Sequence, residues 1–179
     1  MTTAPFLLAN AGVPMLALQL PILAALLVPI IVLEAVVIAK WLQRTWRQGL
    51  RLSAVANVVS TLVGIPLTWG VLFGLQIVIS GAEGYSLSTL PGRLYSAVVQ
   101  APWLLPHPQG LEWLIPAANL VLLPFYFLAS VYSERWVLRR SRHALSPGEA
   151  RLASWLANAA SYALLLVGSI VWFVRSVSR

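Results

Sequence analysis

The chain contains no cysteine and no aspartate, and only 9% of its 179 residues are charged. Without cysteine it can form no disulfide, thiolate nucleophile or cysteine-ligated metal site. Acid–base or metal chemistry would depend on five glutamates and two histidines, and His107 and His143 both fall between apolar runs rather than within them. We therefore expect no enzymatic activity, no metal site and no cofactor.

The composition is instead strongly apolar, with 59% hydrophobic residues. A soluble domain could not cover so much apolar surface with so few charged residues, whereas a lipid bilayer accepts this composition directly. A helix needs about 20 apolar residues to span a bilayer. We expect an all-α integral membrane protein with a single membrane domain over residues 1–179. The first predicted span begins near residue 13 or 21 and ends near residue 39. The other three are predicted at about residues 53–79, 115–133 and 152–174.

Two parts of the chain occur twice. Residues 51–60, RLSAVANVVS, return at residues 151–161 as RLASWLANAAS, with one residue inserted. Such repeats indicate a duplicated structural unit. We predict four transmembrane helices in two tandem helical hairpins, at about 13–80 and 115–174, joined by an outer loop at 81–114. A second set of matches, about 95 positions apart, pairs Pro29, Trp41 and Arg44 with Pro124, Trp136 and Arg139.

The net charge of +7 is concentrated in two links between apolar runs. Cytoplasmic loops carry an excess of lysine and arginine, so both links are predicted to face the cytoplasm and both termini to face outside. The membrane is then the cytoplasmic membrane, or a thylakoid in a photosynthetic source. The links anchor this topology or also bind anionic lipid, and no nucleic-acid partner is expected. Link 40–51 contains Lys40, Arg44, Arg47 and Arg51, and link 135–151 contains Arg135, Arg139, Arg140, Arg142 and Arg151.

The second link also contains short-range signals. Glu134 lies next to Arg135, and Glu149 lies two residues before Arg151, so we expect two local ion pairs. Ser146 precedes Glu149 by three residues, which is the spacing of a capping box. This pattern predicts that the last helix begins just after Ser146.

One acidic residue falls well inside a predicted span. Glu34 precedes Lys40 by six residues, which places it roughly 9 Å inside the inner boundary, where an unpaired carboxylate costs a few kcal/mol. The repeated asparagines and serines reach a similar depth from the same side, which predicts one inner-leaflet polar cluster. It either fixes helix register through hydrogen bonds, or responds to protons or ions, or contacts lipid or pigment. The predicted members are Glu34, Asn57, Ser60, Asn158 and Ser161.

Small residues recur at intervals of four along the second predicted span. Such spacing lets helix backbones approach closely in lipid. We expect these residues to pack against other helices of the same chain. They are Ala56, Ser60, Gly64 and Thr68, followed by Gly70 and Gly74.

The outer loop is apolar and rich in proline and aromatic residues. We expect a short amphipathic turn near residues 91–100, lying in the outer interface. Trp103, Leu104 and Leu105 either fold over the helices of the chain or form an edge at which a partner docks, because exposed apolar surface tends to be occupied.

Two segments of the first hairpin carry a resemblance. Residues 29–36, PIIVLEAV, and residues 56–64, ANVVSTLVG, are similar to a proline-apolar-Glu-Ala stretch and an Asn-x-x-Ser-x-x-x-Gly segment. In these segments the chain resembles the small filament-integrity membrane proteins of cyanobacteria. The resemblance implies a multi-span protein at septa between neighbouring cells, which supports filament integrity and intercellular exchange and has no catalytic residue.

Three functions are compatible with these features. The first is a non-enzymatic structural or assembly component of a membrane complex, with the bilayer and other membrane subunits as partners. The second is a small transporter or channel-like unit that uses Glu34. The third is an accessory subunit of a photosynthetic or respiratory complex. The environment of Glu34 distinguishes the first two, since a structural protein seals this carboxylate against Asn57 or Asn158, whereas a transporter opens it to water.

Overall fold

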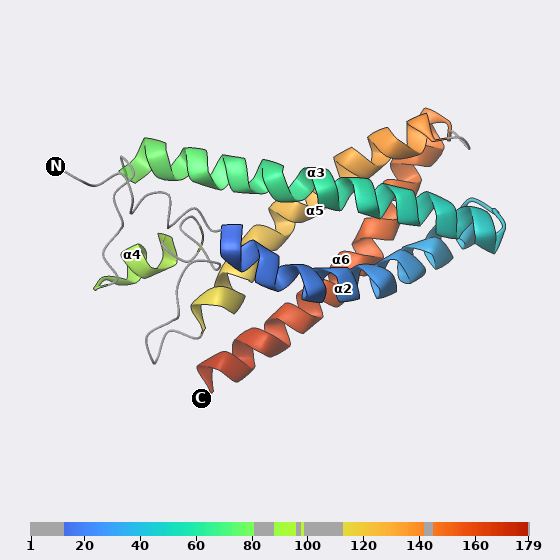
Figure 1. Cartoon of the computed structure of the whole chain (residues 1–179). Helices are drawn as coiled ribbons and strands as arrows, with labels where there is room; N and C mark the ends of the chain where they lie inside the picture. The colour runs from blue at the N-terminus through green and yellow to red at the C-terminus, as the bar shows by residue number, and fades with distance from the viewer. Residues whose placement is uncertain (1–12, 81–87, 96–97, 99–112, 142–144, 179) are drawn as a thin grey trace.

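The computed structural model describes residues 13–80, 88–95, 98, 113–141 and 145–178. The described part of the chain is helical and contains no strand. Within these ranges the chain forms four long helices and one short helix (Figure 1). They are α2 (Val13–Trp41), α3 (Trp46–Ser80), α4 (Leu90–Tyr95), α5 (Leu114–Arg140) and α6 (Pro147–Val177).

Three helices are long and apolar enough to cross a membrane, counted over the described residues. The segments are Trp46–Thr68, Pro116–Arg140 and Pro147–Val177. Pro66 and Pro124 lie inside α3 and α5, as membrane helices tolerate because neighbouring helices and local adjustments satisfy the freed carbonyls. The length and composition of these helices therefore agree with the expectation of a helical membrane protein.

The helices extend further into the links than we predicted. Helix α3 begins at Trp46 rather than near residue 53, and α5 continues to Arg140 rather than ending near 133. Arginine and glutamine are good helix formers, and backbone hydrogen bonding does not stop where apolar residues end. As a result the turn between α2 and α3 is short, and Glu134 lies within α5 rather than in a link.

The four long helices form two pairs that pack on each other. Helix α2 packs against α3, and α5 packs against α6, while α3 also contacts α5 and α2 also contacts α6. Figure 1 shows the α2–α3 pair crossing in front of the α5–α6 pair. This arrangement encloses a central axis lined by all four helices.

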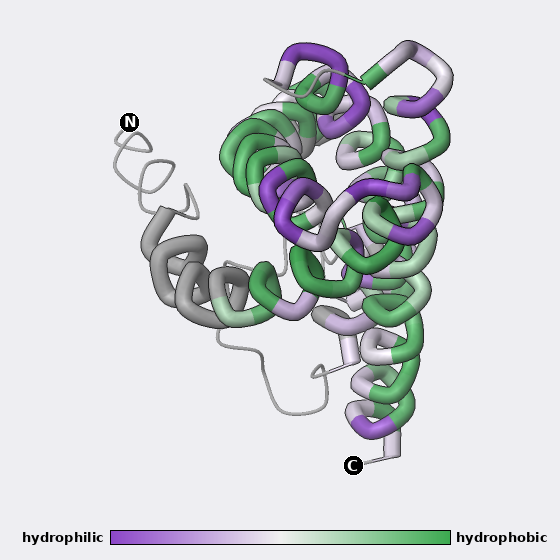
Figure 2. Tube along the Cα trace, turned by 90° about the vertical axis from the view of Figure 1, so that its right-hand side faces the viewer, coloured by the Kyte–Doolittle hydropathy of each residue, from purple (hydrophilic) through white to green (hydrophobic). Residues whose placement is uncertain are grey.

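The bundle exposes large apolar side chains and buries a set of polar ones. Leu62, Phe125 and Val78 are 69%, 66% and 82% exposed, whereas several polar side chains are buried. Figure 2 shows hydrophilic residues gathered where α2 meets α3 and at the neighbouring ends of α5 and α6, with the rest of the helices mostly hydrophobic. Lipid, rather than water, suits such an exterior. The buried polar residues are Glu34, Ser53, Asn57, Ser60, Glu134, Ser154, Asn158, Ser161 and Ser169.

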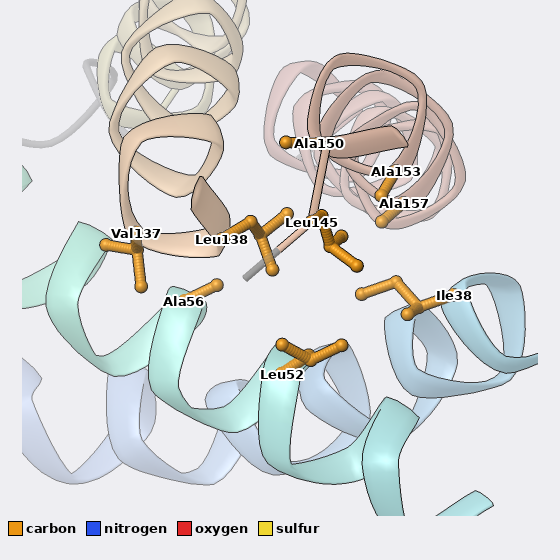
Figure 3. Close-up of a cluster of buried hydrophobic side chains, with 9 residues drawn as sticks. All are labelled: Ile38, Leu52, Ala56, Val137, Leu138, Leu145, Ala150, Ala153 and Ala157. Atoms are coloured by element: carbon orange, nitrogen blue, oxygen red, sulfur yellow. The ribbon is translucent and has the colours of Figure 1, made fainter. Parts of the chain in front are cut away.

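A cluster of buried apolar side chains lies between the helices at the end where the links lie (Figure 3). It lies within about one to two helical turns of the buried glutamates, on the link side. Small side chains of α6 let the helices come close here. The apolar cluster consists of Ile38, Leu52, Ala56, Val137, Leu138, Leu145, Ala150, Ala153 and Ala157.

The two links meet. The guanidinium Nη2 atom of Arg44, in the first link, lies 3.5 Å from Glu149 Oε1, at the start of α6. Ser146 caps α6 and forms the predicted capping box with Glu149, which confirms that prediction. The ion pair predicted between Glu149 and Arg151 is wrong, because the packing of the hairpins brings Arg44 to Glu149 instead.

Helix α4 (Leu90–Tyr95) overlaps the short turn predicted near residues 91–100. The docking residues Trp103, Leu104 and Leu105 lie outside the described residues.

Candidate functional site

Two glutamates are buried in the centre of the bundle. Glu34, on α2, is 1% exposed, and Glu134, on α5, is 2% exposed. A carboxylate at such a position is costly unless it is hydrogen-bonded and compensated. The hydrogen bonds of this pair therefore define the candidate site.

Glu34 accepts one hydrogen bond from its own helix pair and one from the other. Asn57 Nδ2, on α3, donates to Glu34 Oε2 at 2.5 Å. Ser161 Oγ, on α6, donates to Glu34 Oε1 at 2.7 Å. Both oxygens of this carboxylate are thus engaged.

Glu134 is bound in the reciprocal way. Asn158 Nδ2, on α6, donates to Glu134 Oε2 at 2.6 Å, and Ser60 Oγ, on α3, donates to Glu134 Oε1 at 3.3 Å. Each carboxylate therefore takes its asparagine from the adjacent helix of its own pair and its serine from the opposite pair. We call these six side chains the carboxylate network.

The donors are oriented by their own helices. Asn57 Nδ2 also donates to the Ser53 carbonyl oxygen at 3.1 Å, and Asn158 Nδ2 donates to the Ser154 carbonyl oxygen at 2.9 Å. These bonds to the preceding turn hold each amide in one direction. The serine hydroxyls make similar bonds, from Ser60 to the Asn57 carbonyl and from Ser161 to the Asn158 carbonyl.

The structure brings together all five residues predicted for the polar cluster, and adds Glu134. The ion pair predicted between Glu134 and Arg135 is wrong. The third span was expected to end at 133, which placed Glu134 at the membrane boundary, but α5 continues past it and turns its side chain inward.

A sequence signal for Glu134 was present. The spacing of Glu34, Asn57 and Ser60 recurs, with one residue inserted, in Glu134, Asn158 and Ser161. The matches based on proline, tryptophan and arginine instead place Glu34 opposite Ala129. Those matches are about 95 residues apart in the sequence, whereas the corresponding hydrogen-bonding residues of the two hairpins are about 100 residues apart.

No basic side chain neutralises the carboxylates. Over the described residues, their hydrogen-bond partners are amide and hydroxyl groups, and no group of three histidine, cysteine or acidic residues could hold a metal ion. The site therefore consists of two buried carboxyl groups and further oxygen acceptors, with only neutral hydrogen-bond partners among the described residues.

A cavity of about 350 Å³ adjoins the network. Side chains from α2, α3, α5 and α6 line it, including Glu34, Asn57, Asn158 and Ser161. Further from the links it is lined by Thr68, Asn119 and Ser169, with Tyr126 and Tyr162 between. Among the described residues, Glu134 does not line the cavity, so the two carboxylates differ in what they face.

The small residues predicted to pack α3 against other helices lie in different surroundings. Ala56 belongs to the apolar cluster, whereas Gly64 and Thr68 line the cavity. A methyl group added to Gly64, Gly70 or Gly74 would meet no atom within 4 Å, so these glycines do not mark a close approach of two helices. For these three glycines the expected close packing is wrong, because periodic spacing cannot tell which helix face meets a neighbour, whereas Ala56 and Ser60 do contact other helices.

We expect Glu34→Gln to change the free energy of unfolding by less than about 1 kcal/mol, because glutamine can still accept from Asn57 and its amide can donate to the Ser161 oxygen. Glu34→Leu should instead cost about 2 kcal/mol, since it removes the carboxylate acceptor and leaves Asn57 Nδ2 and Ser161 Oγ only acceptors in their own helices. Thermal and denaturant unfolding of the purified chain in detergent measures both values. A glutamine variant as unstable as the leucine variant would show that the negative charge itself is required for folding.

No family model, curated protein or solved structure matches this chain.

Proposed function

We propose that this chain is a non-enzymatic, polytopic membrane protein that acts as a structural or assembly component of a membrane complex. The observation that carries the proposal is the carboxylate network. Glu34 and Glu134 are almost fully buried, and each accepts hydrogen bonds from neutral side chains of two other helices. Hydrogen bonds of this kind fix the register and rotation of membrane helices.

In this proposal α2 is a fourth span, and the chain consists of two tandem hairpins. Helix α2 is 29 residues long and packs against α3 and α6, so it occupies the same kind of position as α5. The reciprocal bonding of Glu34 and Glu134 supports a pseudo-twofold axis along the membrane normal, which relates the hairpins. In the complete bundle, Asn57 and Asn158 then have equivalent roles.

The place of action follows from the charge distribution and the resemblance. The protein resides in the cytoplasmic membrane, or in a thylakoid of a photosynthetic cell, with anionic lipid at the arginine-rich links. A role at cell–cell septa in filament integrity is the specific form that the resemblance in residues 29–64 favours. The exposed apolar surface of the helices is available for other membrane subunits as well as for lipid.

We expect the links to face the cytoplasm and the C-terminal end of α6 to face outside. The contact between Arg44 and Glu149 supports a common side for the links. Because the chain has no cysteine, single cysteines can be introduced without background. Gln48→Cys should react with a membrane-impermeant thiol reagent only after permeabilisation, while Ser178→Cys should react in intact cells. The opposite pattern would reverse the orientation.

A test of the structural role is the size of the particle in mild detergent. We expect the tagged chain, expressed at its native level, to migrate in an assembly much larger than its 19.5 kDa mass. Asn158→Leu, which breaks the network, should release the chain from the assembly, whereas the lipid-facing control Val171→Leu should not. A monomer at native level, in cells whose membrane complexes survive deletion of the chain, would contradict the proposal.

A small transporter or channel-like unit is the second candidate, and the cavity beside Glu34 is the observation that favours it. A flux assay in proteoliposomes distinguishes the two. If Glu34→Gln folds normally but abolishes a flux that the unmodified chain supports, the transport function is correct and the structural role is secondary.

A further inference from the structure

We propose that the cavity beside Glu34 binds a small monovalent cation, inorganic or ammonium, through the Glu34 carboxylate and the Asn158 Oδ1 atom. This inference goes beyond the structural role and does not depend on whether the chain assembles with partners. It requires only the described helices, the carboxylate network and the cavity.

The first step is the balance of charge. Two carboxylates lie within one hydrogen-bonded network, and all their described partners are neutral. A buried negative charge in a membrane protein needs a proton or a cation nearby. No lysine, arginine or histidine lines the cavity, and Glu34 is its one charged lining residue within the described chain. A positive charge supplied from outside the chain meets this need.

The second step is an acceptor without a donor. Asn158 Nδ2 donates to the Ser154 carbonyl, which can only accept, so the orientation of the amide is determined. Its Oδ1 atom is buried and has no hydrogen-bond partner. A buried acceptor left in this state is costly. Asn158 also lines the cavity, and a cation that approaches its amide oxygen from there would supply the missing interaction.

The third step is the kind of cation. The cavity, at about 350 Å³, is far larger than one bare ion, so it fits an ion with part of its hydration or a small ammonium compound. Calcium takes six to eight oxygen ligands, several of which are usually carboxylates. The one carboxylate that lines this cavity among the described residues is too few for a calcium site. Tyr126 and Tyr162 line the same space, and tyrosine rings attract ammonium groups.

The fourth step is the route of entry. The apolar cluster lies on the link side of the carboxylate network (Figure 3). The cavity extends the other way, from Glu34 and Asn158 to Ser169, which is about 16 Å further along α6 at the rise of an α-helix. A cation in the cavity therefore approaches Glu34 from the side opposite the basic links. The arginine-rich links would in any case repel it.

The test is cation-dependent stability of the purified full-length chain. The protein is exchanged into detergent buffer at mildly alkaline pH, with N-methylglucamine chloride holding the ionic strength constant. This salt is then replaced stepwise by sodium, potassium or tetramethylammonium chloride while the melting temperature is recorded. We expect a saturable rise with at least one of the three, because a ligand that binds only the folded state stabilises it. The identity of the active salt separates inorganic from ammonium ligands.

Matched variants locate the site. Glu34→Gln should weaken the apparent affinity roughly a hundredfold, whereas Glu134→Gln, in the same network but off the cavity, should retain most of it. Gly64→Leu should abolish the response, because the leucine side chain would fill the cavity without a clash at its Cβ position. Gly70→Leu is the control: its Cβ position is equally free of contacts, but Gly70 is not among the residues that line the cavity, so the response should remain. The glycine pair leaves both carboxylates intact and decides the question if Glu34→Gln does not fold.

Absence of any cation-specific shift in the folded chain would overturn the proposal and assign the compensating charge to protons. A response that survives Gly64→Leu would overturn it as well, because the cation would then bind elsewhere. Neither result would affect the proposed structural role, which rests on the network and on the size of the native assembly.

Discussion

Replacement of Asn158 by leucine is expected to destabilise the bundle by about 3 kcal/mol, the upper end of the cost of leaving a buried polar group without its partner. The change removes the 2.6 Å hydrogen bond to Glu134 Oε2, and Glu134 retains only the longer bond from Ser60. Asn57→Leu should cost less, because Glu34 keeps its 2.7 Å bond from Ser161. Denaturant unfolding in detergent gives both values.

A double variant separates the loss of hydrogen bonds from the loss of packing. Glu134→Leu combined with Asn158→Leu removes the donor and the acceptor together, and such paired replacements are often nearly neutral. We expect the double variant to recover most of the stability that Asn158→Leu loses. If the two effects simply add, the network is not the source of the destabilisation. Val171→Leu, at a position that is 45% exposed on α6, serves as the neutral control.

Gly49→Leu is expected to cost about 3 kcal/mol, at the upper end of the range for overpacking. A Cβ atom at Gly49 would lie 2.7 Å from the Ala35 carbonyl oxygen and 3.1 Å from Ala39 Cβ. The first of these neighbours is backbone, so α2 and α3 would have to separate. Ala35 adjoins Glu34, and the separation should therefore also disturb the bond between Asn57 and Glu34.

Gly70→Leu is the matched control for Gly49→Leu. Both glycines lie in α3, but a Cβ atom at Gly70 meets nothing within 4 Å, and leucine favours a helix over glycine by up to about 1 kcal/mol. We expect the Gly70 variant to be as stable as the unmodified chain or slightly more stable. Thermal melts of the two variants in the same detergent make the comparison. Equal losses at both positions would mean that the close approach at Gly49 has no energetic importance.

The sequence was sufficient to recognise a helical membrane protein. The membrane character follows from averages over about 20 residues, and these averages do not depend on how the helices pack. The start of α6 was equally accessible, because the capping box of Ser146 and Glu149 is a contact between neighbours in the chain. The burial of Glu34 was also expected, because this residue lies within an apolar run, six residues before Lys40. These features are local, and local chemistry determines them.

Only the tertiary structure revealed the inward position of Glu134, the exchange of serines between helix pairs and the cavity beside Glu34. A helix that extends by one or two turns moves a residue from the boundary into the interior, and helix ends are poorly encoded where arginines continue a helix beyond the apolar run. Which hydroxyl meets which carboxylate depends on the rotation and depth of four helices at once. That information resides in the packing of all of them, and no single segment contains it.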